Sequence, residues 1–239
     1  MHWINEQSSI GIACFVKTPE LSPIKTRLAT SIGRQNALKL YGLMLHGIRQ
    51  IFENLLKIDS NCLTYWAVAE QGSESYWSGF PCLQQSSGDL GDRLHSIYSQ
   101  ILKRHDGAIL IGADCPLLTV DRLHSASQKL RSQQGFILGP SYDGGFYLFG
   151  GTRSIEKKVW NKPTYSSSET KRQLKKELSK IGTVIELEEL IDIDEYEDLK
   201  MISEINNGRI KNPSLIEIVD FSKEILTKFS KNTSTQFCQ

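Results

Sequence analysis

Residues 108–116 read Ala-Ile-Leu-Ile-Gly-Ala-Asp-Cys-Pro, an apolar run that ends at an acid and a proline. Short, wholly apolar runs such as Ala108–Gly112 are typical of strands buried on both faces of a parallel sheet. Asp114 would then lie at the carboxyl end of its strand, the edge at which open α/β sheets bind ligands. The stretch therefore predicts a buried strand that presents a carboxylate to a crevice.

Further strand-like runs lie on both sides of this one. They are Ile10–Val16, Cys62–Ala69, Phe136–Gly139, Phe146–Phe149 and Thr183–Leu187. Amphipathic segments separate most of them, and this alternation is typical of a sheet with helical crossovers. We therefore expect an α/β fold with a mostly parallel central sheet flanked by helices.

Capping patterns predict where the intervening helices begin. The predicted starts are Ser31 for a long first helix, residues 88–92, Thr119, the Ser166/Glu169 pair and the Asp194/Glu197 pair. A length of 239 residues fits one α/β domain, which we place at residues 1–205. Residues 206–239 are expected to form a turn-rich linker and one amphipathic C-terminal helix. That helix should pack on its own domain, with a homodimer contact as the alternative.

Composition excludes several classes of partner. The 28 basic and 27 acidic residues nearly cancel, so no overall field favours nucleic acid or an anionic membrane. No apolar run reaches the roughly 18 residues that span a bilayer, and residues 1–9 lack the features of a signal peptide. The five cysteines are odd in number and form no Cys-x-x-Cys pair. Free thiols and a cytoplasmic location are expected.

Three acids are candidate metal ligands. A lone carboxylate at a strand end, as expected for Asp114, suits Mg²⁺ or Mn²⁺, which prefer oxygen ligands and often share a ligand's phosphates. The alternative is a cap for the next helix, a role that Thr119 already fills. Asp192 and Asp194 would point the same way from an extended segment. Asp194 also has its capping alternative, and most acids of Glu186–Asp198 should form a solvated face.

Three cations, Lys17, Lys25 and Arg27, lie in the predicted loop between the first strand and the first helix. Such a loop can wrap a polyphosphate, with lysine as a point charge and arginine as a bidentate fork. The three side chains could equally be solvated. The loop is not a Walker loop, because the chain contains no G-x-x-x-x-G-K-[ST] motif.

The segment Gly88–Leu94 places glycines and acids at a helix start, with Asp89 and Arg93 as candidate substrate contacts. Asp89 and Asp92 also suit the helix dipole, which is the simpler explanation of the acids. The glycines permit close approach of the backbone to a ligand. The segment therefore fits both a helix start and a ligand contact.

A second glycine-rich turn, Gly139–Gly145, should lie at the same edge of the sheet. Asp143 could orient an acceptor hydroxyl or act as a base, and it could equally form a plain Asp-Gly turn. Gly144 and Gly145 of that turn are candidate substrate contacts. Asp143 is thus the catalytic candidate of the chain.

Five ordered motifs together resemble a family of small bacterial transferases. The motifs are FVKTP…KTRL (15–28), GDLGDRL (88–94), IGADCP (111–116), GPSYDGGFYL (139–148) and DID…DL (192–199). They are similar to the glycosyltransferase-A-fold family of nucleotide-diphospho-sugar transferases, which includes arsenosugar-biosynthesis glycosyltransferases encoded near radical-SAM enzymes. More distantly they resemble the 2-phospholactate and molybdenum-cofactor guanylyltransferases. The resemblance covers about residues 10–205.

The resemblance implies a Rossmann-like sheet with a nucleotide at its carboxyl edge and a metal at Asp114. The phospholactate type implies further metal ligands at Asp192 and Asp194. The three loop cations then fall where related enzymes contact phosphates. The family loop usually reads Pro-x-x-Gly before Lys-Thr-Arg, whereas residues 21–23 read Leu-Ser-Pro. The cations, rather than the loop backbone, are therefore the expected phosphate contacts.

These residues fit more than one reaction. The preferred hypothesis is metal-dependent glycosyl transfer from a nucleoside-diphosphate sugar to a small-molecule acceptor, with Asp143 placing the acceptor. The alternative is nucleotidyl transfer, which releases pyrophosphate from a nucleoside triphosphate; the same residues would serve, and fold analogy does not separate the two. A third reading is a regulatory module that binds nucleotide without catalysis. A metal-dependent product from any nucleotide donor would exclude it.

Overall fold

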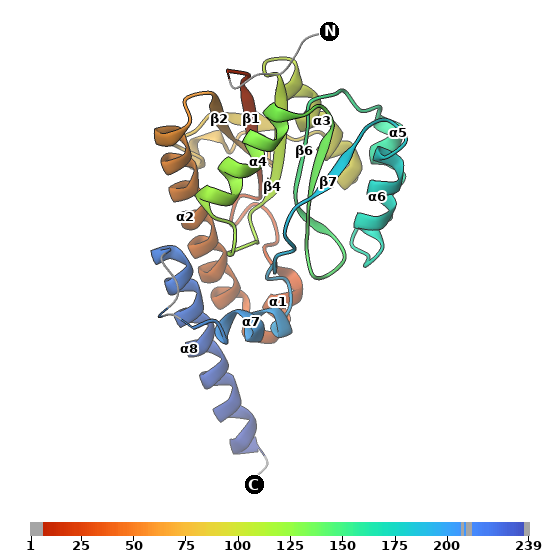
Figure 1. The fold of residues 1–239 in the computed structure, drawn as a ribbon. Helices are drawn as coiled ribbons and strands as arrows, with labels where there is room; N and C mark the ends of the chain where they lie inside the picture. The colour runs from red at the N-terminus through yellow and green to blue at the C-terminus, as the bar shows by residue number, and fades with distance from the viewer. Residues whose placement is uncertain (1–6, 207, 209–211, 237–239) are drawn as a thin grey trace.

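A seven-stranded sheet forms the centre of the computed structural model, which describes residues 7–206, 208 and 212–236 (Figure 1). The strand order is β3-β2-β1-β4-β6-β5-β7. The strands are β1 Ile10–Val16, β2 Cys62–Val68, β3 Cys82–Gln84, β4 Gly107–Gly112, β5 Phe136–Pro140, β6 Phe146–Gly151 and β7 Val184–Glu186. The predicted strands are all present, and the short β3, which the sequence pattern did not indicate, adds an edge.

The sheet is mostly parallel, as predicted. β1 pairs in parallel with β2 and β4, and β5 pairs in parallel with β7. Only β6 runs against its neighbours β4 and β5, because a tight turn at residues 141–145 connects it directly to β5. The carboxyl ends of β1, β4 and β5 therefore meet at one edge, as the position of Asp114 requires.

Helices cover both faces of this sheet and enclose two apolar cores (Figure 1). One face carries α1, α2, α4, α7 and α8, and the other carries α3, α5 and α6. Their bounds are α1 Thr26–Ile32, α2 Arg34–Ile58, α3 Leu90–Leu102, α4 Val120–Ser132, α5 Lys157–Trp160, α6 Thr170–Leu178, α7 Tyr196–Ser203 and α8 Pro213–Gln236, with a 3-10 helix, η1, at Glu74–Tyr76. The result is a three-layer α/β/α arrangement.

The first predicted helix is two helices. Ser31 was expected to cap it, but Ser31 lies inside α1, and Gly33 separates α1 from α2. Gly33 has φ +81°, a conformation that side-chain-bearing residues rarely adopt, so the chain breaks there and restarts without a serine cap. Lys25, at the start of α1, also has a left-handed backbone with φ 44°. The break brings Lys25 and Arg27 to the beginning of a short helix of their own.

Two further predicted caps are wrong. Asp194 does not cap α7, because Glu195 and Asp198 form the capping box of that helix. The pair Ser166/Glu169 forms no capping box either, since Glu169 precedes α6 without a side-chain cap and Ser166 lies in the preceding loop with φ 56°. Thr119 does cap α4, as predicted, by accepting a hydrogen bond from the Arg122 amide at 3.2 Å.

Helix α8 packs against α2 and α7 (Figure 1). Its apolar residues, among them Ile218, Val219 and Ile225, belong to the core beside α2 and α7. The domain boundary at 205/206 and the homodimer remain predictions, and positions 207, 209–211 and 237–239 of the predicted linker and C-terminus lie outside the described residues. Of the helices in the described ranges, none is both long and apolar enough to cross a membrane.

Candidate active site

An extended segment after β7 carries two acids to the end of β4. The Leu190 amide donates to the Pro140 carbonyl at 3.0 Å, and the Ile193 amide donates to the Asp114 carbonyl at 2.9 Å. Ile193 is fully buried, so the aspartates on either side of it face the cavity beside Asp114. The three acids predicted as metal ligands therefore come together, although Asp114 precedes Asp192 by 78 residues in the sequence.

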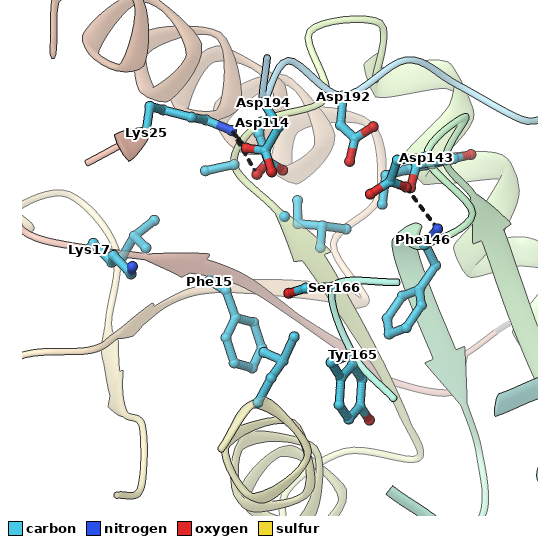
Figure 2. Close-up of a pocket in the computed structure, with 18 of the residues that line it drawn as sticks. Phe15, Lys17, Lys25, Asp114, Asp143, Phe146, Tyr165, Ser166, Asp192 and Asp194 are labelled. Atoms are coloured by element: carbon cyan, nitrogen blue, oxygen red, sulfur yellow. Dashed lines mark hydrogen bonds and ion pairs between the residues drawn. The ribbon is translucent and has the colours of Figure 1, made fainter. Parts of the chain in front are cut away.

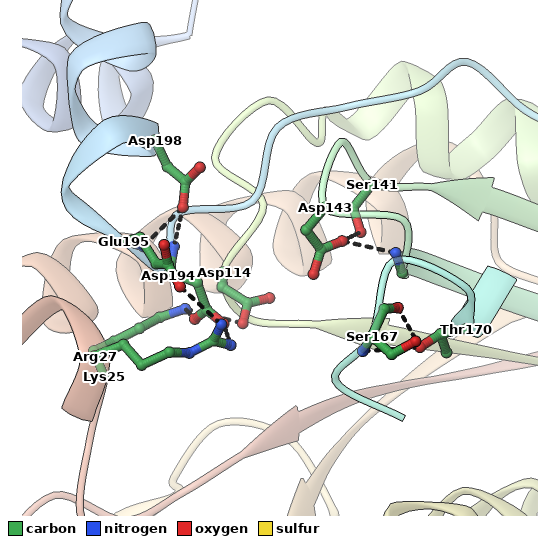
Figure 3. Close-up of polar contacts among 11 residues, drawn as sticks. Lys25, Arg27, Asp114, Ser141, Asp143, Ser167, Thr170, Asp194, Glu195 and Asp198 are labelled. Atoms are coloured by element: carbon green, nitrogen blue, oxygen red, sulfur yellow. Dashed lines mark hydrogen bonds and ion pairs between the residues drawn. The ribbon is translucent and has the colours of Figure 1, made fainter. Parts of the chain in front are cut away.

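Two cations pair with these acids (Figure 3). The Lys25 ammonium lies 3.0 Å from Asp114 Oδ2 and 2.7 Å from Asp194 Oδ1, and only 6% of the lysine side chain is exposed. The Arg27 guanidinium donates to the second oxygen of Asp194 and, at 3.1 Å, to Glu195. Carboxylates and cations alternate across the cluster. An arrangement of this kind can hold phosphate and metal in one place.

The ionisation of the cluster follows from burial and charge. Burial alone would raise the pKa of Asp114, but the Lys25 ammonium outweighs it and lowers that pKa. Burial alone would lower the pKa of Lys25, but Asp114 and Asp194 outweigh it and raise that pKa. For Asp192, burial acts together with the charges of Asp114 and Asp143 and raises the pKa to about 7. Unlike Asp114 and Asp194, Asp192 thus has no cation within ion-pair distance in the described part of the chain.

Mg²⁺ and Mn²⁺ require oxygen ligands, which the carboxylates of this site can supply. Within the described ranges, no three His, Cys, Asp or Glu side chains form a group that could hold a metal ion by themselves. Mg²⁺, however, is usually bound through one or two carboxylates together with substrate phosphates and water. Asp114 and Asp194 converge on one cation, the Lys25 ammonium, with facing oxygens. These residues fit a metal that arrives with phosphates.

A cavity of about 490 Å³ lies over this edge of the sheet (Figure 2). Lys25, Asp114 and Asp194 gather at one end of it, and aromatic side chains line the other. Of the predicted site residues, those that line the cavity are Lys17, Lys25, Arg27, Arg93, Asp114, Asp143, Gly145, Asp192 and Asp194. The volume of the cavity is typical of small-molecule sites, and its charged end suits a charged ligand.

Asp143 is anchored in its own turn. Its Oδ1 accepts hydrogen bonds from the Ser141 hydroxyl at 2.6 Å and the Gly145 amide at 2.7 Å (Figure 3). Gly144 has φ +85°, and a Cβ on it would overlap the Ser168 backbone. The turn is therefore an Asp-Gly turn, as one alternative predicted, and it also directs the carboxylate of Asp143 into the cavity. Glycine at position 144 lets the turn pack closely against the loop before α6.

The two residues predicted from the segment Gly88–Leu94 have local roles. Asp89 caps α3 by accepting from the Asp92 amide at 2.9 Å, and it is not among the residues that line the cavity. Arg93 lines the cavity and donates through Nε to the Gly88 carbonyl at 3.1 Å. The helix-start explanation thus accounts for Asp89, whereas Arg93 keeps both roles.

Side chains from other segments hold the loop after β1 in place. Thr18, 3% exposed, accepts from Trp77 Nε1 at 2.9 Å and donates to the Ser73 hydroxyl at 3.0 Å. Its amide donates to Glu70 Oε2 at 2.7 Å. The Lys17 amide donates to the Tyr41 hydroxyl at 3.0 Å. These contacts fix the loop that leads to Lys25, and the sequence offered no local pattern for them.

Five aromatic residues that line the cavity were not predicted as site residues: Phe15, Tyr41, Phe146, Tyr147 and Tyr165. Phe15, Phe146 and Tyr165 come from β1, β6 and the loop before α6, and all three are half-buried (Figure 2). In the sequence each looks like a core residue. The available signal was position alone, since Phe15 and Phe146 lie next to motif residues at strand ends. The aromatic end of the cavity could therefore be found only from the fold.

Part of the chain matches the model of a known protein family. Residues 59–167 match the family described as "Uncharacterized protein conserved in bacteria (DUF2064)". That match includes Asp114 and Asp143 and covers less than half of the chain. No curated protein sequence matches the chain.

Solved structures share the fold over nearly the whole chain. A "putative nucleotide-diphospho-sugar transferase" from Desulfovibrio desulfuricans G20 is 21% identical, with 93% of this chain and 98% of that chain covered and a TM-score of 0.80. The 4-diphosphocytidyl-2C-methyl-D-erythritol synthase of Anaerococcus prevotii DSM 20548 is 8% identical, with 84% and 97% covered and a TM-score of 0.53. A CMP:2-keto-3-deoxy-manno-octonic acid synthetase in complex with CTP is 12% identical, with 82% and 97% covered and a TM-score of 0.50. The chain has the glycosyltransferase-A-like fold, as predicted. Fold alone does not settle the reaction.

Proposed function

We propose that this chain is a metal-dependent glycosyltransferase that uses a nucleoside-diphosphate sugar and a small-molecule acceptor. The observation that carries the proposal is the cluster of Lys25, Arg27, Asp114 and Asp194 at the carboxyl edge of the sheet, beside a cavity of about 490 Å³. Such a cluster presents both the cations that bind a diphosphate and the carboxylates that bind its metal.

The leaving diphosphate would lie against the charged end of the cavity. Lys25 and Arg27 would bind its oxygens, and the arginine fork allows a bidentate contact. Asp114 and Asp194, with Asp192 facing the same space, would hold Mg²⁺ or Mn²⁺. When bound, such an ion neutralises charge that develops on a departing phosphate chain. Residues after β4, at the start of α1 and in the segment before α7 would thus stabilise the leaving group.

The acceptor would lie on the Asp143 side. Because Ser141 and Gly145 fix one oxygen of Asp143, the carboxylate has a set direction, and it can orient an acceptor hydroxyl and take its proton. The acceptor oxygen bonds to the anomeric carbon of the sugar, and the bond from that carbon to the diphosphate breaks. A nucleoside diphosphate leaves intact.

Nucleotidyl transfer is the second candidate. The same cations and carboxylates would also bind a triphosphate, and a synthetase that shares this fold has been solved with CTP bound. In that reaction a substrate phosphate would attack the triphosphate, and pyrophosphate would leave from the same cations. A cytoplasmic location fits either reaction, and the four cysteines in the described part of the chain are free thiols.

An assay of both leaving groups separates the two. The protein would be incubated with Mn²⁺, nucleotide sugars or nucleoside triphosphates, and a small-molecule extract as acceptor source. We expect nucleoside diphosphate from a nucleotide sugar. Pyrophosphate from a triphosphate, without diphosphate from any sugar donor, would replace the first candidate by the second. An absence of both products would leave the regulatory nucleotide-binding module.

A further inference from the structure

Lys25 occupies the position between the two best-placed metal ligands. Its ammonium contacts Asp114 Oδ2 at 3.0 Å and Asp194 Oδ1 at 2.7 Å, and the side chain is 6% exposed (Figure 3). A divalent metal would bind the same oxygens at about 2.1 Å. An ammonium and a metal ion cannot share that space, so they compete for Asp114 and Asp194.

Charge balance decides how that competition ends. The two carboxylates that a metal would use, Asp114 and Asp194, already pair with Lys25 and Arg27, whereas Asp192, which faces the same space, forms no ion pair within the described ranges. A free divalent ion would therefore have to displace the Lys25 ammonium and leave it without a partner in a partly buried site, which is costly. A diphosphate that arrives with the metal brings negative charge of its own. It also gives the displaced ammonium new acceptors.

The backbone of Lys25 is held at the start of α1, but its side chain can move. Its carbonyl accepts the Ala29 amide at 2.8 Å in the first turn of α1, and its φ of 44° is rarely adopted by side-chain-bearing residues. The four-carbon stem is flexible, and the cavity adjoins it. The ammonium can therefore leave the carboxylates for a phosphate without rearrangement of the helix.

We propose that Lys25 acts as a substitute cation that keeps the metal site closed to free Mg²⁺ or Mn²⁺, so that the metal enters together with the diphosphate as one complex. The inference rests on the proposed function and names the form of its donor substrate, a metal–diphosphate complex. Lys25 then has two successive partners, the carboxylates in the empty site and the phosphates in the loaded one.

The test measures Mn²⁺ binding, by the loss of the free-ion signal in electron paramagnetic resonance, for the full chain. Wild type, Lys25→Met and the control Lys175→Met would be titrated with Mn²⁺ alone and with inorganic pyrophosphate, uridine diphosphate or guanosine diphosphate present. Lys175 is a suitable control because it also pairs with an acid, Glu186 at 2.7 Å, but on the surface of α6. Circular dichroism would establish that each variant is folded.

In the wild type and Lys175→Met, Mn²⁺ should bind weakly alone and about tenfold or more tightly with a diphosphate. Lys25→Met should bind Mn²⁺ alone about tenfold more tightly than wild type, and the added diphosphate should increase its affinity much less. Mn²⁺ should also raise the melting temperature of Lys25→Met more than that of wild type. If the Lys25→Met variant does not fold, Lys25→Gln would take its place in the same comparison.

Two contrary results have different meanings. If wild type binds Mn²⁺ with diphosphate, and Lys25→Met binds Mn²⁺ alone no better than wild type, the substitute-cation inference is overturned and the proposed function stands. If no protein binds Mn²⁺ or any diphosphate under any condition, the metal-dependent function fails, and the inference fails with it.

Discussion

Asp194 shows how a single residue can have its role decided by its neighbours. The sequence left it two roles, helix cap and metal ligand. Because Glu195 and Asp198 form the capping box of α7, the carboxylate of Asp194 is available to Lys25 and Arg27. One oxygen faces each cation. The residue therefore belongs to the ion cluster and not to the helix start.

Arg27→Ala should weaken binding of nucleoside diphosphates by about 2–4 kcal/mol if the guanidinium makes a bidentate phosphate contact. The lower end of that range is expected, because 56% of the side chain is exposed. Uridine and guanosine diphosphates should be affected alike, as isothermal titration in Mn²⁺ would measure. Arg122→Ala is the control, since Arg122 also pairs with an acid, Glu188 at 2.8 Å. A loss confined to one base would mean that the loop contacts the base.

At the scale of elements, strands were predicted better than helix starts. A strand buried on both faces, such as β1 or β4, must be apolar throughout, so its run of residues is recognisable locally. A helix start is decided by competing local partners. Gly33 interrupts the predicted first helix through its φ of +81°, and Ser166, expected as a cap, lies in the loop with φ 56°. Neither conformation follows from capping patterns.

The candidate site was predictable to the extent that it depends on strand ends. Asp114 and the loop cations follow from that rule, and the structure brings Asp114, Lys25 and Arg27 together with Asp194, whereas Lys17 lines the cavity apart from them. Phe146 and Tyr165 were missed because half-buried aromatic residues have the same pattern as core residues. The tie of Thr18 to Trp77 joins segments 59 residues apart, which no local pattern reveals.

Gly144→Ala should detach the turn of Asp143 from the loop before α6. Its φ of +85° and the adjacent Ser168 backbone leave no room for a Cβ, so the variant should lose more than about 1 kcal/mol of unfolding free energy. Gly42→Ala is the control. A Cβ there meets nothing within 4 Å on α2, and helix propensity predicts a gain of about 0.5–1 kcal/mol. Equal urea midpoints for Gly144→Ala and wild type would contradict this view of the turn.

At the scale of the whole molecule, the amino and carboxyl ends of the parallel strands carry different ion pairs. At the amino edge, Arg131 pairs with Asp59 at 2.6 Å and also donates to the Ser8 carbonyl at 2.8 Å, and both side chains of the pair are at most 7% exposed. Burial alone would raise the pKa of Asp59, but hydrogen bonds from Arg131 and Cys62 outweigh it and lower that pKa. This edge faces away from the cavity, so its pair is assigned to stability.

Asp59→Asn should therefore lower the free energy of unfolding by about 3–5 kcal/mol at pH 7, because it leaves a buried guanidinium without its counter-ion. The pKa of Asp59 is lower in the folded state than in the unfolded chain, where it is about 3.9. The contribution of Asp59 to stability is thus complete at pH values above its unfolded-state pKa. It is lost as the pH falls through the folded-state pKa. Urea denaturation at several pH values measures this. A difference between variant and wild type that does not shrink in acid would contradict the assignment.

The proposed function requires Asp114 to hold a divalent metal together with a nucleotide at the carboxyl edge. The most direct measurement compares Asp114→Asn with Asp121→Asn, an exposed acid in the first turn of α4, by titrating nucleoside diphosphate in the presence and absence of Mn²⁺. Asp121→Asn should match wild type. Asp114→Asn should keep the circular dichroism spectrum of wild type and lose about 100-fold in Mn²⁺-dependent affinity, equivalent to about 2.8 kcal/mol. Equal Mn²⁺-dependent affinity in Asp114→Asn and wild type, with unchanged spectra, would contradict the account.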